Sequence, residues 1–549
     1  MKKTGKILFA TLLFLMMPVL FSGWYDKEFE WSKNLEIYHS LVRELELYYV
    51  DETDPGKLIR TSIDQMLRTL DPYTVYIPES QTEDLQLMTT GEYGGVGATI
   101  AQDSSRIFIS DPYEGSPAVR AGLRAGDVIL KIDDRSVEGK TTAEISPLMK
   151  GPVGSSVKLT VERPYTKEKL TVNLIREIIR FPNVPYFKLM EGGTGYIRLS
   201  GFTEGAGREV REALLKLKDQ GAVRVILDLR SNPGGLLIEA VEVMNLFVPK
   251  GQEIVSTRGK SKQWEVTYSC RYEPVDTLIP VAVLVNSGSA SAAEIVAGAM
   301  QDLDRGVIIG QRTFGKGLVQ TTRNLSYNAN LKLTTAKYYI PSGRCIQALD
   351  YGNRRADGSV GHVPDSLISA YRTKRGRIVR DGGGIVPDII TNPLQLSSVT
   401  ANLLYSNLIF DYATRYRNFH QQAAKPSEFV LTDEVYSDFR DFLAGQNFSY
   451  ETGSEAALQT LVRMAKAEKY YESSAHLFEE LKTNLSHNLG KDLANLKPEI
   501  SVMLADEIVG RYYYQKGRIE FMIRDDEVIV RAHEILENAQ EYRQMLNAR

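Results

Sequence analysis

Apolar side chains recur at helical spacing near the start of the chain. One such set is Leu35, Tyr38, Leu41, Val42 and Leu45. A second set is Leu58, Ile63, Met66, Leu67 and Leu70. Residues three and four positions apart share one face of an α-helix, so the pattern predicts helices from about Trp31 to Thr90. The stretch "LDPYTVYIP" (70–78) interrupts them. We take 26–90 as an N-terminal helical region.

The pattern then changes to short alternating or β-branched runs separated by glycines. "GATIAQ", "RIFISDP", "DVILKIDD" and "SVKLTVER" all have this character. Alternation with a period of two is typical of half-buried strands, and glycine marks the turns between them. Residues 91–178 are therefore predicted to form a compact, mostly β domain.

Strands and helices alternate over residues 179–395. "GYIRLS", "RVILDLR", "PVAVLVN" and "GVIIG" look like strands, and "REVREALLKLKDQ" and "SAAEIVAGAMQD" look like helices. Such alternation favours an α/β core with a central sheet and flanking helices. Residues 396–549 have mainly helical periodicity, which predicts a helical C-terminal domain. The fold class is multidomain α/β.

Composition and charge restrict the classes of function that are possible. The 549 residues suffice for about three or four domains, and 43% hydrophobic and 25% charged residues are ordinary for a folded protein. The net charge of −3 gives no basic excess to displace counterions from nucleic acid. No nucleic-acid partner is expected.

The first 25 residues have the pattern of a secretory signal. Lys2, Lys3 and Lys6 form a basic head, and an apolar run follows from Ile7 to Phe21. Cleavage near Gly23 and retention as a single N-terminal membrane anchor both stay open. Either outcome predicts export to a bacterial cell envelope, in the periplasm.

Two cysteines, Cys270 and Cys345, are too few for a zinc ribbon or a disulfide scaffold. Two interpretations stay open: the pair forms a disulfide in an oxidising compartment, or both are small buried apolar residues.

The run "PVAVLVNSGSASAAEIVAGAMQD" (280–302) joins a buried strand to an amphipathic helix through serine, glycine and alanine. A strand, a sharp turn and a helix can expose a nucleophile at the helix N-terminus, where free N–H groups stabilise an oxyanion. The alternative is that Ser287, Ser289 and Ser291 only cap the helix. This run alone does not decide between them.

The histidines restrict the possible base. They stand at His39, His362, His420, His476, His487 and His533. None lies in the α/β region before residue 361, so a Ser-His-Asp triad would lack its base there. A buried lysine is the alternative, because burial disfavours its charged form. Lys316, between Gly315 and Gly317, fits this need, and Gln320 could hold its amine without adding charge.

"IIGQRTFGKGLVQ" (308–320) also has the glycine and lysine spacing of a phosphate-binding loop. Such a loop continues with Ser or Thr and opens a helix. Here Gly317 follows, and "LVQTTRNL" predicts a strand.

A second glycine element, "VILDLRSNPGGLL" (225–237), has two interpretations: it aims an N–H into a cleft, or it is a tight turn.

Together, "DLRSNPGG", "NSGSASAAE" and "TFGKGLVQ" resemble the C-terminal processing peptidases, or tail-specific proteases, in order and spacing over about residues 30–395. The resemblance implies that Ser291 is the nucleophile, Lys316 the general base and Gln320 the residue that orients Lys316. It further implies that the N–H groups of Gly235 and Ala292 form the oxyanion hole. Ala293 replaces a serine common in relatives. "GGGIVPDI" (382–389) resembles the strand that closes the family's core.

The β domain resembles a PDZ domain, inserted between the helical region and a serine protease core. "GEYGGVGATI" (91–100) is similar to a carboxylate-binding loop, and "SPAVRAGLRAGDVILKIDD" (116–134) to the PDZ stretch of bacterial proteases. Consecutive glycine N–H groups can form a nest for a peptide carboxylate. The resemblance assigns this binding to Tyr93, Gly94, Gly95, Val96 and Gly97.

These observations predict an exported serine endopeptidase that captures the free C-terminus of unfolded or tagged proteins and needs neither metal nor cofactor. The resemblance implies a homodimer or larger assembly and allows an activating adaptor protein. Two rivals remain: an inactive PDZ-bearing binding or adaptor protein, and a nucleotide-dependent enzyme that uses residues 310–316.

Overall fold

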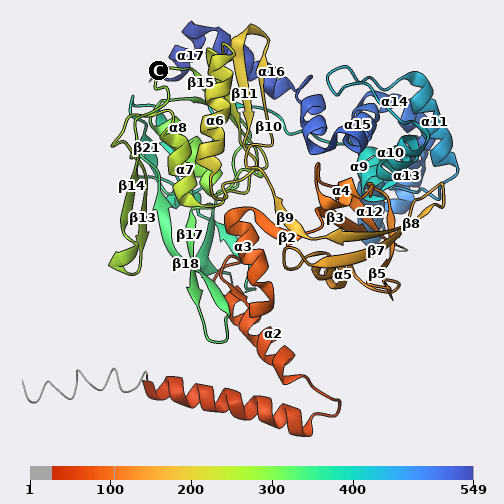
Figure 1. The fold of residues 1–549 in the computed structure, drawn as a ribbon, viewed down its shortest axis with the longest axis horizontal. Coiled ribbons are helices and arrows are strands. Elements are labelled where there is room, and N and C mark those ends of the chain that lie inside the picture. The colour runs from red at the N-terminus through yellow and green to blue at the C-terminus, as the bar shows by residue number, and fades with distance from the viewer. Residues whose placement is uncertain (1–27, 104–105, 356, 548–549) are drawn as a thin grey trace, which may run out of the picture. The chain divides into compact units, whose positions relative to one another are not determined.

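The computed structural model describes residues 28–103, 106–355 and 357–547 (Figure 1). They form two compact units, one of the described residues up to 80 with 320–334 and the other of the described residues of 81–319 and from 335 on. The predicted signal or anchor segment 1–25 lies outside the described residues. In the described ranges, no helix is long and apolar enough to cross a membrane.

The first unit is largely helical, as predicted. A helix over residues 28–48 is followed by α2 (Pro55–Arg68) and β1 (Val75–Ile77). Asp54 starts α2, since its side chain accepts a hydrogen bond from the N–H of Lys57 at 3.0 Å. β1 pairs with residues 330–332. The break predicted over 70–78 contains this strand.

The β domain is a sheet in the order β3-β4-β5-β7-β8, with β6 beside β5. Two short helices, α4 and α5, complete it. Inward residues such as Ile109, Ile132 and Leu159 make its core. β2 (Glu92–Gly95) and β9 (Glu177–Arg180) pair at its two ends, close to the predicted limits of 91 and 178. The remaining bounds are β3 (Ala98–Gln102), β4 (Ile107–Pro112), β5 (Val128–Ile132), β6 (Arg135–Ser136), β7 (Ser156–Glu162), β8 (Lys169–Ile175), α4 (Pro117–Arg120) and α5 (Thr142–Met149).

The α/β core contains a sheet in the order β10-β11-β12-β15-β16-β23. Its strands are parallel except for the antiparallel pair β10 and β11. Parallel strands covered on both faces are continuously apolar, and all five residues of β15 are buried. The strand bounds are β10 (Tyr186–Met190), β11 (Thr194–Arg198), β12 (Arg224–Asp228), β15 (Val281–Val285), β16 (Val307–Gly310) and β23 (Ile389–Ile390).

Different helices cover the two faces of this sheet. Val281, Val283 and Val285 pack with α6 (Ala206–Asp219), α7 (Leu237–Met244) and α8 (Ala292–Asp302). The alternate residues Ala282 and Leu284 pack with α16 (Glu527–Glu537) and α17 (Ala539–Met545). Successive strand residues point to opposite faces, so the core needs both helix sets.

The C-terminal region therefore divides in two. Its last two helices pack on the sheet of the core, although the sequence assigns 396–549 to one helical domain. Tyr542 of α17 illustrates the contact, because its hydroxyl accepts a hydrogen bond from the N–H of Val281 at 3.0 Å.

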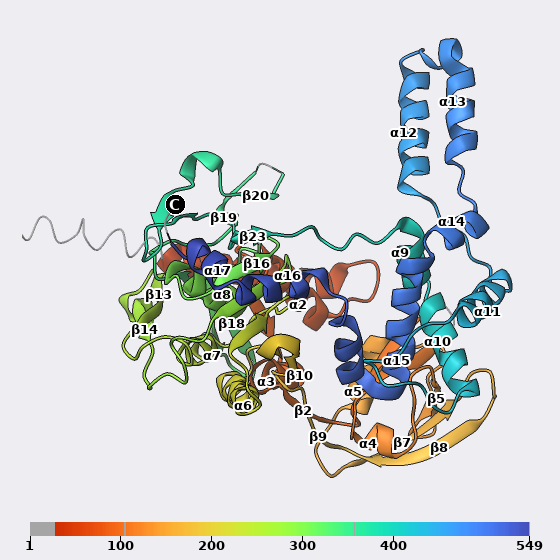
Figure 2. The same ribbon diagram turned by 90° about the horizontal axis from the view of Figure 1, so that it is seen from above.

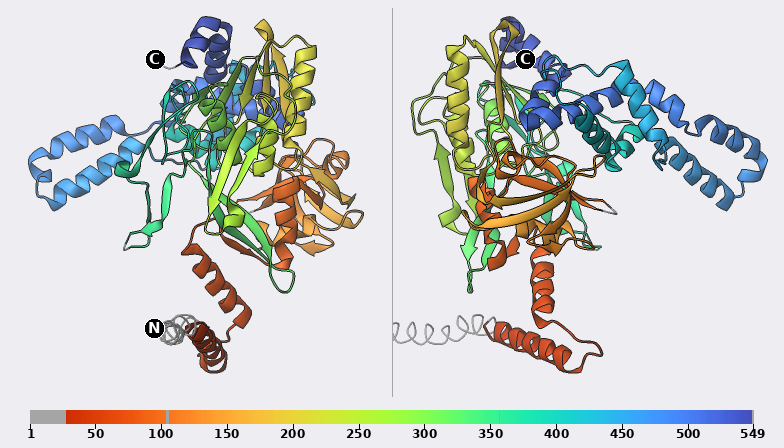
Figure 3. Two further views of the ribbon diagram at one scale, coloured as in Figure 1. Left: turned by 90° about the vertical axis from the view of Figure 1, so that its left-hand side faces the viewer. Right: turned by 45° about the vertical axis from the view of Figure 1, so that its right-hand side comes forward.

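The earlier C-terminal helices have a separate apolar core, which includes Leu403, Tyr412, Phe439 and Ile508. α12 and α13 extend from it as a hairpin (Figures 2 and 3). An ion pair of 2.7 Å between Arg106 and Asp411 joins the β domain to this region. The bounds are α9 (Ser398–Tyr405), α10 (Leu408–Phe419), α11 (Asp433–Ala444), α12 (Gly453–Ala467), α13 (Tyr471–Leu485), α14 (Leu489–Asn495) and α15 (Lys497–Met522).

The other segments are short or lie at sheet edges, and the residues of β17 and β18 are divided between the two units. α3 ends at Thr90 and is capped by Gly91, which has a left-handed φ of 73°. β13 pairs with β14 and with residues 336–339 of β18. Two small hairpins consist of β19 with β20 and β21 with β22. The bounds are α3 (Thr82–Thr90), β13 (Glu253–Gly259), β14 (Val266–Ser269), β17 (Leu318–Asn324), β18 (Asn330–Tyr339), β19 (Leu349–Arg354), β20 (Val360–His362), β21 (Ala370–Arg372) and β22 (Ile378–Arg380).

Both cysteines are free thiols. Cys270 is buried in the core and Cys345 is partly buried, so of the two interpretations the structure favours small apolar residues over a disulfide. Burial raises the pKa of the Cys270 thiol to about 12, which keeps it protonated at neutral pH.

The packing of α16 predicts that it stabilises the core. Ile535 is fully buried against the sheet and Val530 on the same helix is 48% exposed. Ile535→Ala is expected to lower the free energy of unfolding of the core by about 2–5 kcal/mol, because it leaves a cavity. Val530→Ala should change it by less than about 0.5 kcal/mol. Urea unfolding measures both, and equal effects would contradict this packing.

Candidate active site

The predicted strand, turn and helix are present around Ser291. β15 ends at Val285, the turn follows, and α8 begins at Ala292 with Ser291 as its N-cap residue. Ser291 has φ 55° and ψ −114°, a backbone conformation that costs a non-glycine residue on the order of 1–3 kcal/mol. Strained residues of this kind are typical of functional sites, because the surrounding contacts must hold them.

Glu294 supplies these contacts. Its carboxylate is fully buried and accepts a hydrogen bond from the N–H of Ser291 at 2.9 Å. The same oxygen accepts one from the N–H of Lys316 at 2.8 Å. The other oxygen accepts from the N–H of Gly315 at 2.7 Å and the hydroxyl of Thr313 at 2.6 Å. One carboxylate thus holds the backbones of Ser291 and Lys316 next to each other.

Burial raises the pKa of Glu294, while the hydrogen bonds from Thr313, Lys316, Gly315 and Ser291 oppose that shift. Tyr338, also buried, donates from its hydroxyl to the carbonyl of Ser291 at 3.2 Å. Both polar groups of the Ser291 backbone are therefore held by side chains from inside the core.

The glycines on either side of Lys316 are required by close packing. A Cβ at Gly315 would lie 2.4 Å from the Cβ of Ala348, and one at Gly317 would lie 2.8 Å from the N–H nitrogen of Gln347. Lys316 itself is partly buried. The residues that follow form the predicted strand β17 and no helix, so this segment lacks the architecture of a phosphate-binding loop.

The second glycine element approaches the nucleophile closely. A Cβ at Gly234 would lie 2.8 Å from the Cβ of Ser291 and 2.9 Å from the N–H nitrogen of Ala292. Among the residues that the structure describes, the N–H groups of Gly235 and Ala292 have no hydrogen-bond acceptor. Two free N–H groups beside a serine can stabilise an oxyanion. Asn232 fixes this approach, since its carbonyl accepts from the N–H of Ala290 at 2.9 Å.

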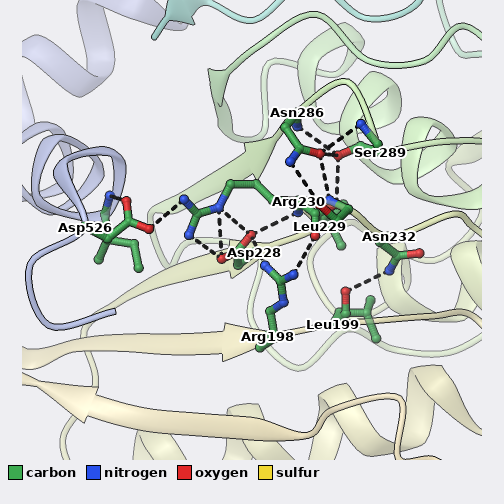
Figure 4. A network of polar contacts seen from close by, with 12 residues as sticks. Arg198, Leu199, Asp228, Leu229, Arg230, Asn232, Asn286, Ser289 and Asp526 are labelled. Atoms are coloured by element: carbon green, nitrogen blue, oxygen red, sulfur yellow. Dashed lines mark hydrogen bonds and ion pairs between the residues drawn. The ribbon is translucent and has the colours of Figure 1, made fainter. Parts of the chain in front are cut away.

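Ser289 has a structural role, because its hydroxyl is used in hydrogen bonds to the backbone. It is fully buried, its hydroxyl donates to the carbonyl of Leu229 at 2.7 Å, and it accepts from the N–H of Asn286 at 2.9 Å (Figure 4). Ser287 is exposed on the same turn.

Gln320 lies on β17 and donates from its amide to the hydroxyl of Thr334 at 3.3 Å; both residues belong to the first compact unit. Its role toward Lys316 stays a prediction.

Sequence reasoning missed two parts of the site. Glu294 is not among the residues that the sequence pattern singles out, although its position three residues after Ser291 is the spacing of a capping box. An ionic cluster of Arg198, Asp228, Arg230 and Asp526 precedes the glycine element (Figure 4). Its last member is far away in sequence, so no local signal could reveal it.

A groove of about 470 Å³ lies on the β domain between β3 and α5. Tyr93 and Val96 line it, with Ile100, Met149 and Lys150. In the described part of the chain, the N–H groups of Val96 and Gly97 have no acceptor, as a carboxylate nest requires.

Gly94 and Gly95 pair with β9 instead. Gly97 has φ 77°, and a Cβ there would lie 2.3 Å from the Cβ of Ser116.

No group of three or more His, Cys, Asp and Glu side chains in the described ranges could hold a metal ion.

Glu294→Gln tests the shared carboxylate. The amide would place an NH₂ donor against the N–H donors that the carboxylate now accepts, so the backbones of Ser291 and Lys316 should separate. We expect hydrolysis of a peptide substrate to slow by at least about tenfold. Glu209→Gln is the control, because that carboxylate also binds a backbone N–H, that of Val184 at 2.9 Å, but lies on α6. Equal turnover in wild type and Glu294→Gln would contradict the role of Glu294.

Three family descriptions match parts of the chain. "Peptidase family S41" matches residues 193–352, which include Ser291 and Lys316. "PDZ domain" matches residues 108–163, in the β domain. "Probable PDZ-protease, C-terminal helical domain" matches residues 399–536. The PDZ fold and the protease core expected from the sequence are therefore confirmed.

Two relatives in sequence support the same assignment, and one solved structure is reported with them. A "Carboxy-terminal-processing protease" of Bartonella bacilliformis is 39% identical over 58% of this chain and 73% of its own length. A "Probable CtpA-like serine protease" of Staphylococcus aureus is 36% identical over 57% of this chain and 63% of its own length. A solved "Photosystem II D1 C-terminal processing protease" is 29% identical over 64% of this chain and 86% of that one, with a TM-score of 0.35. The chain belongs to the C-terminal processing peptidases of family S41.

Proposed function

We propose that this protein is a serine endopeptidase that cleaves proteins near their C-terminal end, with Ser291 as nucleophile and Lys316 as general base. The observation that carries the proposal is the Glu294 carboxylate, which holds the backbones of these two residues together. The free N–H groups of Gly235 and Ala292 beside Ser291 give it further support.

The reaction follows from the proposed roles. Neutral Lys316 takes the proton from the hydroxyl of Ser291, and the serine oxygen attacks the peptide carbonyl. The oxyanion accepts hydrogen bonds from Gly235 and Ala292. The Lys316 ammonium then protonates the leaving amine, and an acyl-enzyme remains. A water molecule, deprotonated by Lys316, attacks the acyl carbon and releases the second product.

Gln320 is proposed to orient the amine of Lys316. A neutral amide suits this task, because a carboxylate would favour the charged ammonium and remove the base. No cofactor takes part in the proposed reaction.

The PDZ domain is proposed to capture the free C-terminus of an unfolded or tagged protein. The N–H groups of Val96 and Gly97 would donate hydrogen bonds to the carboxylate, and the edge of β3 would pair with the preceding residues of the peptide. The apolar lining of the groove, with Val96, Ile100 and Met149, favours an apolar last side chain.

Export to the cell envelope rests on the N-terminal sequence alone. A homodimer or larger assembly is supported by the helix over residues 28–48, where Trp31, Leu35 and Leu41 are 78%, 61% and 55% exposed. Apolar side chains in such a row usually find a partner. An activating adaptor is a further candidate partner. The alternative function, an inactive PDZ-bearing adaptor, has no observation in its favour.

The proposed dyad is tested by two substitutions. Ser291→Ala and Lys316→Ala should each lower degradation of an unstructured protein by at least about a thousandfold, because each removes one half of the proton transfer. Binding of the same protein to Ser291→Ala should persist. Full degradation by either variant would refute the dyad, and binding of ATP by the wild type would revive the nucleotide rival.

Capture of the C-terminus is tested with paired peptides on the Ser291→Ala chain. A peptide with a free carboxylate and an apolar last residue should bind at least about tenfold more tightly than its C-terminal amide, because only the carboxylate can accept from the nest. Fluorescence anisotropy measures both. A peptide with a last Asp serves as control and should bind weakly. Equal affinity for acid and amide would contradict the nest.

A further inference from the structure

The loop that presents the Gly235 N–H adopts an unusual backbone path. Ser231 has φ 55°, Gly234 has φ 95° and Gly235 has φ 147°. Only glycine accepts the last two angles without strain. Ser231 is held through its N–H, which donates to the side chain of Asn286 at 2.7 Å. A loop of this kind keeps its shape only while its ends are anchored.

Arg230 anchors the start of this loop. Its guanidinium binds both carboxylate oxygens of Asp228, and its backbone N–H donates to Asp228 at 2.9 Å. Arg198 pairs with the same carboxylate at 2.9 Å and donates to the carbonyl of Arg230 at 2.7 Å. Asp228 is fully buried. Burial alone would raise the pKa of Asp228, but Arg230 and Arg198 lower it to about 2.

The remaining nitrogen of Arg230 points to the C-terminal segment. Nη1 donates to Oδ2 of Asp526 at 2.7 Å, and Figure 4 shows Asp526 on the opposite side of the guanidinium from Asp228. The other oxygen of Asp526 caps α16 by accepting from the N–H of Val528 at 2.9 Å. α16 packs on the core sheet. Asp526 thus joins a fixed helix to the anchor of the loop.

The charges of the cluster balance only when Asp526 is counted. Arg198 and Arg230 carry two positive charges, and Asp228 carries one negative charge. Asp526 supplies the second negative charge, and its side chain is only 20% exposed. Without it, one of the two positive charges would stay uncompensated and largely buried beside the loop, which is costly.

We infer that Asp526 is a positioning residue of the active site: by holding Arg230 it keeps the loop 231–235, and with it the N–H of Gly235, in place for catalysis. The inference deepens the proposed function and rests on it. The last two helices then contribute to turnover as well as to stability, although α16 begins more than two hundred residues after Ser291.

Three substitutions in the full chain isolate this role. Asp526→Ser keeps an oxygen that caps α16 but is too short to reach Arg230. Asp526→Asn keeps both the cap and an acceptor for Arg230. Asp525→Ser is the matched control, since Asp525 is its neighbour, is 77% exposed and pairs only with Arg524 in the described part of the chain.

We expect Asp526→Ser to lower kcat for a peptide substrate by at least about tenfold with KM changed less than twofold, because the groups that bind the substrate in its ground state are untouched. Asp526→Asn should retain at least about half of kcat, and Asp525→Ser all of it. The thermal midpoint of each variant shows whether it is folded.

The outcomes separate this inference from the proposed function. A wild type that cleaves, an inert Ser291→Ala and an unchanged kcat in Asp526→Ser would overturn the role of Asp526 alone. An equal loss of kcat in Asp525→Ser, or a loss in Asp526→Ser only at temperatures where it unfolds, would also overturn it. Cleavage by Ser291→Ala would instead overturn the proposed function.

Discussion

The proposed active site depends on one buried carboxylate, that of Glu294. A carboxylate with no access to water must find hydrogen-bond donors, and Glu294 finds four of them. Two belong to the backbones that carry the proposed nucleophile and base. The need to satisfy one buried charge therefore decides where the turn before α8 meets the segment that contains Lys316. The strained backbone of Ser291 is tolerated because its N–H and its carbonyl both have fixed partners.

The second constraint is the sheet that supports this site. Its strands are apolar on both faces, so each face needs a cover. α6, α7 and α8 cover one face, and the end of the chain returns to cover the other. The position of the last helices brings Asp526 to Arg230, at the end of the strand that leads into the glycine element. Packing and site geometry are thus linked through residues very far apart in sequence.

Much of this was readable from the sequence. The strand, turn and helix around Ser291, the strand after Lys316 and the β domain of residues 91–178 follow from local periodicity and glycine placement, and all are present. Glu294 was readable in principle, because its spacing from Ser291 is that of a capping box. The features that could not be predicted from the sequence are tertiary contacts. The contacts of Glu294 with residues 313–316, and the return of α16 to the core sheet, depend on which surfaces meet when the chain folds, and local patterns do not contain that information.

The central claim is that Ser291 is an activated nucleophile whose reactivity depends on Lys316. Reaction with a fluorophosphonate, followed by peptide mapping, tests it most directly, because the adduct marks the reacting hydroxyl without any choice of substrate. The account predicts one adduct, on Ser291, which forms much more slowly in Lys316→Ala. An adduct on Ser287 or Ser289, or labelling of Ser291 at the same rate without Lys316, would contradict the account.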